Sequence, residues 1–318
     1  MTTTTALNPS NPYIVPDAIN ETPGLVNAAG GTIFQTTITA SLATAASPIV
    51  SGTTNIHAET YNGAIPGPTF RLMVNDTVIV RLINDLPYPT GIHWHGIELT
   101  NSADGTPVTQ DGASGAPLQT LGNGVPAGGT YLYKFTVTRP GIFWYHPHHF
   151  HSTNRVFRGL YGMIIISNSN EQSLVITPAQ PTNPLPPASN TIPVVLSDIT
   201  VCKIAGSNDA ATYVAPATPA NAEWVSGATT QGGPTPVVLC ETPLNEDGTT
   251  TPGAAPLAAG DVPNIQKDAT PGVIPVVEGQ TVLTNGVNVG SRQGTPTTAG
   301  GNPGPGALDP SAYTLPVQ

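Results

Sequence analysis

The chain has few charged residues, few aromatic residues and little sulfur. Charged residues make up 9% of its 318 residues, aromatic residues 6%, and there are two cysteines and three methionines. The formal net charge is −10, and the 9 lysines and arginines form no cluster, so we expect no binding to nucleic acid phosphates. No apolar run approaches the ~18 residues of a membrane span, so none is expected.

The N-terminus and the cysteines bear on where the protein works. Residues 1–9 lack the basic start and apolar core of a secretory signal. The scarcity of lysine and the abundance of Thr, Pro and Gly nevertheless favour an extracellular or periplasmic protein whose signal has been removed; a cytoplasmic chain is the alternative. In an exported chain, Cys202 and Cys240 are expected to form one disulfide, which stabilises by ~4 kcal/mol. Two free buried thiols are the alternative.

Glycine and proline are abundant, at 34 and 35 residues, and this disfavours long helices. Alternating apolar runs separated by turn residues predict an all-β protein. About seven short strands within ~140 residues are typical of a β-sandwich or barrel with Greek-key links. The predicted strands are Thr32–Leu42, Thr54–Tyr61, Asp76–Asn84, Gly91–Leu99, Thr130–Thr138, Gly141–Tyr145 and Leu160–Ser167.

The composition changes along the chain and predicts four regions. Residues 1–30 form an extended arm, residues 31–170 a β domain, residues 171–190 a Pro-rich linker, and residues 191–318 a second β domain. The second domain is incomplete and rich in loops, because it offers too few strands for a full sandwich. Its predicted strands are Ile192–Thr200, Pro236–Cys240, Val273–Val277 and Thr281–Leu283.

Two pairs of histidines, each spaced by one residue, dominate the first domain: His93-Trp-His95 and His146-Pro-His148. In a strand, residues i and i+2 point to the same face, so the two pairs can present four imidazoles to one point. Imidazole is the commonest ligand for copper and zinc near neutral pH. The pattern therefore predicts a multi-histidine metal site, with zinc as the weaker alternative.

The surroundings of these pairs resemble the N-terminal cupredoxin domain of the multicopper oxidases, the family of laccases, ascorbate oxidase and bacterial copper oxidases. The resemblance covers roughly residues 55–167. It implies a cupredoxin-like Greek-key β-sandwich, followed by an incomplete second cupredoxin-like domain at residues 191–318. The motifs that carry it are Gly63-Ala-Ile-Pro-Gly-Pro-Thr69, His93-Trp-His-Gly96, Asp104-Gly105, Trp144-Tyr-His-Pro-His148 and Gly159-Leu-Tyr-Gly162.

The resemblance also implies roles for individual residues. His93 corresponds to a ligand of the type 2 copper, and His95, His146 and His148 correspond to ligands of the type 3 coppers, so the chain would supply half of the ligands of a trinuclear cluster. Asp104 stands where the family places a carboxylate thought to deliver protons to reduced oxygen, as a general acid. The alternative is that Asp104 only holds an Asp-Gly turn.

The remaining histidines of the chain receive other roles. His149 and His151 are expected to support the ligands or the loop rather than to bind copper. His57 is expected to be structural.

The chain lacks the His-Cys-His motif that a type 1 copper requires. Neither Cys202 nor Cys240 has a histidine neighbour, and no histidine follows His151. We therefore expect the type 1 copper and the other cluster ligands to come from a C-terminal cupredoxin domain or a second polypeptide carrying His-Cys-His.

The resulting prediction is the N-terminal part of a laccase-like multicopper oxidase. Such an enzyme couples one-electron oxidation of a donor, a phenol or a metal ion, to the four-electron reduction of dioxygen to water. The chain alone is expected to be inactive. The alternative is a catalytically inactive copper-binding or structural cupredoxin module.

Overall fold

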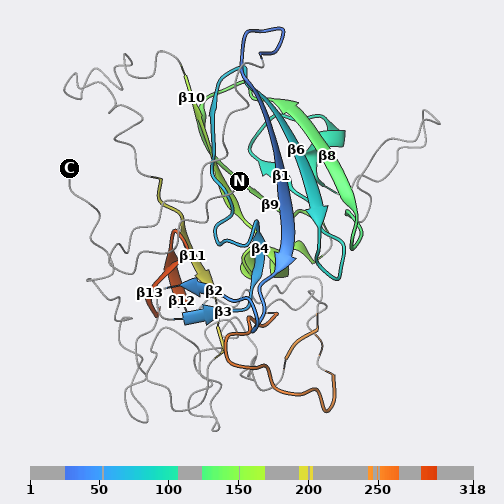
Figure 1. Cartoon of the computed structure of the whole chain (residues 1–318), viewed down its shortest axis with the longest axis vertical. Coiled ribbons are helices and arrows are strands. Elements are labelled where there is room, and N and C mark those ends of the chain that lie inside the picture. The colour runs from blue at the N-terminus through green and yellow to red at the C-terminus, as the bar shows by residue number, and fades with distance from the viewer. Residues whose placement is uncertain are drawn as a thin grey trace, which may run out of the picture.

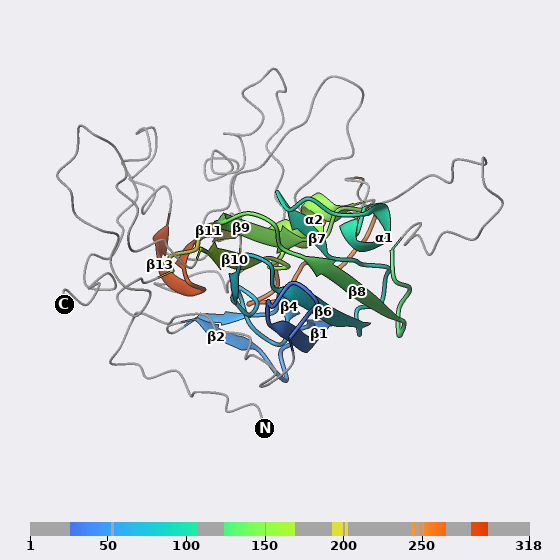
Figure 2. The same cartoon turned by 90° about the horizontal axis from the view of Figure 1, so that it is seen from above.

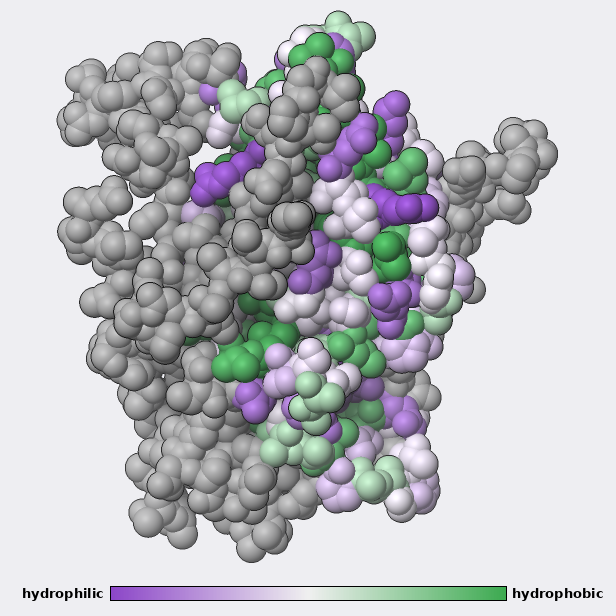
Figure 3. All heavy atoms as spheres, viewed as in Figure 1, coloured by the Kyte–Doolittle hydropathy of each residue, from purple (hydrophilic) through white to green (hydrophobic). Residues whose placement is uncertain are grey.

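A computed structural model describes residues 26–51, 54–106, 124–149, 151–168, 193–199, 201–202, 243–245, 249, 251–264 and 281–291. Among these residues, two four-stranded sheets pack face to face, and two smaller sheets lie beside them (Figures 1 and 2). Where the described surface is visible in Figure 3, hydrophilic and hydrophobic residues are intermixed.

The first large sheet has the order β4-β1-β6-β8. Strand β1 runs parallel to β6 and antiparallel to β4, and β6 runs antiparallel to β8. The alternation of β-branched and aliphatic residues in β6 explains its place in the sheet, because every second side chain enters the core. The bounds are β1 Ile33–Leu42, β4 Glu59–Tyr61, β6 Thr77–Asn84 and β8 Thr130–Thr136.

The second large sheet has the order β5-β10-β9-β7 and carries both histidine pairs. Strand β9 pairs antiparallel with β10 on one side and with β7 on the other. A short helix follows each histidine strand: α1 (Asn101–Asp104) follows β7, and α2 (Ser152–Phe157) follows β9. The bounds are β5 Phe70–Met73, β7 His93–His95, β9 Gly141–His146 and β10 Gly162–Ser167.

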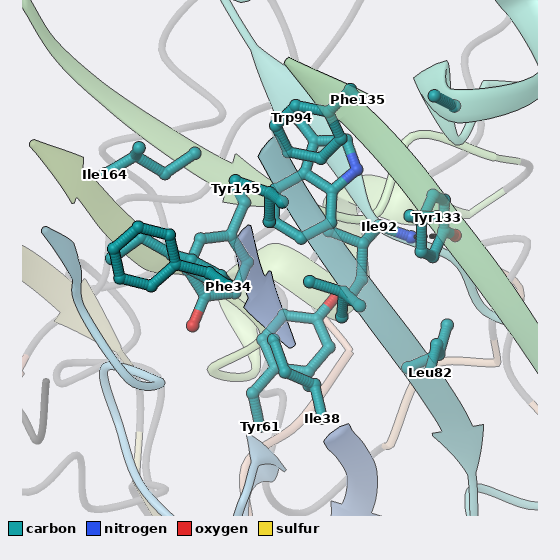
Figure 4. Packing of buried hydrophobic residues seen from close by; sticks show 14 of the residues in the cluster. Phe34, Ile38, Tyr61, Leu82, Ile92, Trp94, Tyr133, Phe135, Tyr145 and Ile164 are labelled. Atoms are coloured by element: carbon teal, nitrogen blue, oxygen red, sulfur yellow. Dashed lines mark hydrogen bonds between the residues drawn. The ribbon is translucent and has the colours of Figure 1, made fainter. Parts of the chain in front are cut away.

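Aromatic rings from both sheets fill the space between them (Figure 4). Trp94, Tyr133 and Tyr145 are fully buried. The hydroxyls of these two tyrosines have backbone partners: that of Tyr133 accepts from the N–H of Ile92, and that of Tyr145 donates to the carbonyl of Pro68. The core thus places satisfied polar atoms directly beneath the strands that carry the histidines.

The later part of the chain contributes a three-stranded sheet, β11-β12-β13, which lies near the small sheet β2-β3 (Figure 1). A second apolar cluster joins this part to the sandwich, since Ile65 and Tyr161 pack with Ile199 and Leu283. The bounds are β2 Ile49–Ser51, β3 Thr54–Ile56, β11 Leu196–Ile199, β12 Thr281–Thr284 and β13 Val287–Ser291.

A histidine–aspartate pair reinforces this contact. Nδ1 of His57 lies 2.9 Å from Oδ1 of Asp261, and the backbone N–H of His57 donates to the carbonyl of Gly260. His57 is therefore a structural contact, as expected. Nearby, Cys202 is disulfide-bonded; the chain's other cysteine, Cys240, lies outside the described residues.

The fold class predicted from the sequence, an all-β cupredoxin-like sandwich, is confirmed. Two predicted strands differ in detail. The strand predicted over Thr54–Tyr61 is divided into β3 and β4, because the backbone at His57 turns to pair with Gly260. The strand predicted over Gly91–Leu99 is only β7, which ends where Gly96 adopts a φ of +84°.

Several short elements were not predicted, namely β2, β5, β13 and both helices. The boundaries of the four predicted regions stay predictions. The linker 171–190 and the predicted strands Pro236–Cys240 and Val273–Val277 lie outside the described residues, as does most of the arm 1–30. Within the described part of the chain, neither helix is long or apolar enough to cross a membrane.

Candidate metal centre

The pairing of β7 with β9 builds the site. His93 lies opposite His146, Trp94 opposite Tyr145, and His95 opposite Trp144. Because side chains alternate along each strand, Trp94 and Tyr145 point into the core while the histidines point away from it. Three imidazoles from two strands therefore meet on one face of the sheet.

The ring nitrogens of these three histidines converge. His93, His95 and His146 each offer one nitrogen, and these three atoms lie within 4.8 Å of one another. Nδ1 of His95 is 3.1 Å from Nε2 of His146. When two imidazole nitrogens bind the same metal ion at ~2.0–2.1 Å, they lie about 3 Å from each other. The nitrogens of His95 and His146 are therefore spaced to share one metal ion.

Hydrogen bonds on the other ring nitrogens fix which atom of each histidine faces the site. Nδ1 of His146 donates to the carbonyl of Pro147 at 2.7 Å, and Nδ1 of His93 donates to the carbonyl of Asp104 at 2.9 Å. A carbonyl oxygen only accepts, so these Nδ1 atoms carry the proton. Nε2 of each ring is therefore the unprotonated nitrogen, which is the arrangement found around metal-binding histidines; in this structure Nε2 of His146 is in contact with Nδ1 of His95.

The carboxylate of Asp104 also contacts the site. Its Oδ1 lies 3.1 Å from Nδ1 of His93, and its Oδ2 accepts a hydrogen bond from Thr106. Asp104 therefore orients His93 with two oxygens, one from its backbone and one from its side chain. The sequence suggested a proton-delivery role for Asp104 but not this support of the His93 ring.

The electrostatic environment favours the neutral form of two of these histidines, His95 and His146. Burial, together with the fields of His93, His95 and His148, lowers the pKa of His146 to about 4. Burial and the fields of His93 and His148 also lower the pKa of His95. Metal ions bind the neutral form of imidazole, so these side chains are ready to bind without losing a proton near neutral pH.

His148 lies beside the cluster, outside the group of three converging nitrogens. Its ring centroid is 4.9 Å from that of His93 and 5.9 Å from that of His146. Strand β9 ends at His146, so the two-residue alternation that was expected to align His148 with His146 does not continue. The expectation of four imidazoles at one point is thus met by three, and the ligand role of His148 stays a prediction.

Sequence reasoning missed Trp144 as part of the site. Its ring stacks on His146 with centroids 3.8 Å apart and planes at 25°, and it lies 5.2 Å from the ring of His95. The signal was available, because Trp144 stands two residues before His146 on the same strand face. Stacking on Trp144 restricts the rotation of the His146 ring.

The two remaining histidines belong to the turn after β9. His149 is buried, and its ring hydrogen-bonds the backbone of Pro89; burial lowers its pKa to about 4. His151 has a φ of +63° and precedes α2 as its N-cap residue. Neither belongs to the three-histidine group found among the described residues.

Glycines close to the site allow backbone approach that a side chain would block. Gly105 has a φ of +70°, and a Cβ there would lie 1.8 Å from the carbonyl oxygen of Ile92. This close packing brings Asp104 under His93. Glycine is therefore required after Asp104, because any side chain at residue 105 would collide with the backbone of Ile92.

A cupredoxin-like sandwich in which three histidines converge from two strands defines a candidate metal-binding domain. Comparison with known proteins gives the family: residues 44–171 match the family model for multicopper oxidases. Residues 44–171 are therefore a multicopper oxidase domain.

Individual relatives agree. The chain is 38% identical over 113 residues to multicopper oxidase MmcO of Mycobacterium tuberculosis, covering 35% of this chain and 20% of MmcO. It is 38% identical over 109 residues to copper resistance protein A of Escherichia coli, covering 34% and 16% of the two chains. It is 36% identical over 114 residues to laccase-2 of Cryptococcus neoformans, covering 35% and 17%. The matched region spans one fifth or less of these relatives.

Solved structures of other proteins also align with parts of this chain. A multicopper oxidase from Campylobacter jejuni, described as a metallo-oxidase, aligns with a TM-score of 0.47 and 18% identity, over 87% of this chain and 40% of that chain. A laccase from Pediococcus acidilactici aligns with a TM-score of 0.45 and 26% identity, over 60% and 36%.

Proposed function

We propose that this chain is the N-terminal part of a laccase-like multicopper oxidase and supplies half of the ligands of a trinuclear copper cluster. The observation that carries the proposal is the convergence of His93, His95 and His146 within 4.8 Å. In this assignment His93 binds the type 2 copper, and His95, His146 and His148 bind the type 3 coppers. Bound copper supplies the one-electron redox chemistry by which dioxygen is reduced to water.

The protein's own contribution is orientation. The carbonyl of Pro147 and both oxygens contributed by Asp104 hold the Nδ1–H groups of His146 and His93, so that the opposite nitrogens face the metal. In this proposal the carboxylate of Asp104, which is only partly buried, also hands a proton to oxygen as it is reduced. Thr106 orients that carboxylate through its second oxygen.

The set of ligands in this chain is incomplete for the whole reaction. The sequence has no His-Cys-His motif, so the type 1 copper and the other half of the cluster come from a C-terminal cupredoxin domain or a second polypeptide. That partner would also receive electrons from the donor, a phenol or a metal ion. The full enzyme would work outside the cytoplasm, in the extracellular space or the periplasm.

Copper titration of the purified 318-residue chain tests the assignment. We expect Cu(II) to bind the wild-type chain and to give an electron paramagnetic resonance spectrum with nitrogen coupling. The copper-loaded chain should consume no oxygen when a phenol is added. His146→Ala should weaken binding, whereas His57→Gln, a histidine change in the contact with Asp261, should not. Equal binding by wild-type and His146→Ala chains would refute the site.

A native mass spectrum separates the proposed enzyme from an inactive copper-binding module. Material from the natural source that contains a longer chain or a second polypeptide, and additional copper, would support the proposed enzyme. A lone ~33 kDa species that binds copper without any partner would favour the inactive module.

A further inference from the structure

A buried ion-pair cluster lies apart from the histidine rings and joins the two segments that carry them. Glu59 on β4 is 0% exposed, and its carboxylate accepts a hydrogen bond from the hydroxyl of Tyr88. The same Oε1 lies 3.1 Å from Nη1 of Arg155 and 2.9 Å from Nε of Arg158. One carboxylate oxygen is thus shared by three side chains.

Tyr88 connects this cluster to the first histidine pair. It lies five residues before His93, in the loop that leads into β7. The guanidinium carbon of Arg155 lies 3.2 Å from the centroid of the Tyr88 ring, so the ring is held between an arginine and Glu59. The backbone carbonyl of Tyr88 also accepts a hydrogen bond from Asn84 at the end of β6. The loop before His93 is therefore fixed at both its backbone and its side chain.

Arg155 and Arg158 connect the cluster to the second histidine pair. They belong to α2 and its C-cap, which follow His148 after a three-residue turn. Helix α2 has only six residues, and its N-cap makes no side-chain capping hydrogen bond. A helix this short is not stable by itself in water, so tertiary contacts must hold it.

Glu59 supplies much of that tertiary contact. Besides its carboxylate pairs, its backbone N–H donates to the carbonyl of Arg158 at 2.9 Å. Arg155 is itself only 3% exposed. Removing one partner of a buried ion pair leaves an uncompensated charge, which is strongly unfavourable, so the segment must move or hydrate when Glu59 is lost.

We propose that Glu59 is a positioning residue for the metal centre: it binds the segment before His93 and the segment after His148 to one buried carboxylate, and so fixes the turn that carries His148 relative to the loop that leads to His93. The proposal rests on the proposed function of the histidines. Strand β4 carries no metal ligand, but through Glu59 it would help to set the geometry of the site.

The test compares three variants of the full chain. Glu59→Gln keeps the shape of the side chain and removes its charge. Tyr88→Phe removes one hydrogen bond and keeps the ring beneath Arg155. Asp76→Asn is the matched control: Asp76 is 2% exposed and its carboxylate accepts from the backbone of Thr32 and Met73, which belong to neither histidine segment.

Each variant is measured under conditions in which circular dichroism shows it to be fully folded. We expect Glu59→Gln to weaken Cu(II) binding about 10-fold or more and to shift the copper hyperfine splitting. Tyr88→Phe should produce a smaller change of the same kind. Asp76→Asn should destabilise the chain yet bind Cu(II) with the wild-type affinity and spectrum. Wild-type copper binding and spectrum in Glu59→Gln, or an equal loss in Asp76→Asn, would overturn the proposal.

A second measurement needs no metal and separates this proposal from the proposed function. In the metal-free chain, Glu59→Gln should move the imidazole nitrogen resonances of His93 and His148, while Asp76→Asn leaves them in place. If the wild-type chain fails to bind Cu(II) but these resonances move, the function is wrong and the positioning role holds. If copper binds and the resonances stay fixed in both variants, the positioning role is wrong. If Glu59→Gln does not fold, Tyr88→Phe tests the positioning role by the same two measurements, Cu(II) binding and the imidazole nitrogen resonances.

Discussion

Replacing Trp94 with alanine is expected to lower the free energy of unfolding by about 3–5 kcal/mol. Trp94 is fully buried between the two sheets. Its ring lies 4.9–5.6 Å from the ring centroids of Phe70, Tyr133, Phe135 and Tyr145. Alanine would remove these contacts at once and leave a cavity under the strand that carries His93 and His95 (Figure 4).

The size of the effect depends on two opposing contributions. Each aromatic pair contributes ~0.5–1.5 kcal/mol beyond its buried area. The loss of these pairs moves the expected destabilisation by Trp94→Ala toward the upper end of its range. Against this, the indole Nε1 of Trp94 is buried and finds no hydrogen-bond acceptor among the described residues. Such a group costs about 1–3 kcal/mol, and both substitutions remove that cost. Trp94→Phe keeps a ring in the core, so we expect a loss of only about 1–2 kcal/mol.

Urea unfolding of the full chain, followed by far-ultraviolet circular dichroism, measures both variants. This signal does not depend on the tryptophan that is removed. A loss below about 1 kcal/mol for Trp94→Ala would refute the packing argument. If Trp94→Phe were as costly as Trp94→Ala, the argument that the indole N–H is an unsatisfied donor would be wrong.

Three further predictions concern the site and the tyrosines. Gly105→Ala should destabilise the chain and weaken Cu(II) binding in titrations, because its Cβ would collide with the carbonyl of Ile92 and displace Asp104. Asp104→Asn should weaken Cu(II) binding by about 10-fold, the low end for a residue that orients a ligand, since the backbone carbonyl of Asp104 still holds His93. Burial raises the pKa of the Tyr145 hydroxyl well above its usual value. The contribution of the neutral Tyr145 side chain to stability is therefore complete below pH ~10 and is lost as the pH rises further. We expect absorbance at 295 nm to show Tyr145 ionising only at the pH at which circular dichroism reports unfolding.

Features set by local alternation could be predicted from the sequence. The period of two placed His93 and His95 on the same face of their strand, and it gave β6 and β8 nearly their observed bounds. These features depend on neighbours two residues apart, which a single sequence displays directly.

Features that depend on distant partners could not be predicted. The strand predicted over Thr54–Tyr61 is interrupted because Gly260, some two hundred residues later, pairs with His57. Glu59 looked like one acidic residue among many, and only the fold brings it to Arg155 and Tyr88. Helix α2 has no apolar period or capping residue strong enough to reveal it, since tertiary ion pairs hold it.

The four histidines are consequently held by two different means. His93, His95 and His146 lie within paired strands, so the sheet and the Trp94 core beneath it fix them. His148 lies beyond the end of β9, and its position depends on the turn and helix that follow. Loss of the Glu59 ion pairs should therefore disturb His148 more than His95, whereas loss of the Trp94 ring should do the reverse. The same sheet that gives the domain its stability thus fixes three imidazoles, and a separate buried carboxylate is needed for the fourth.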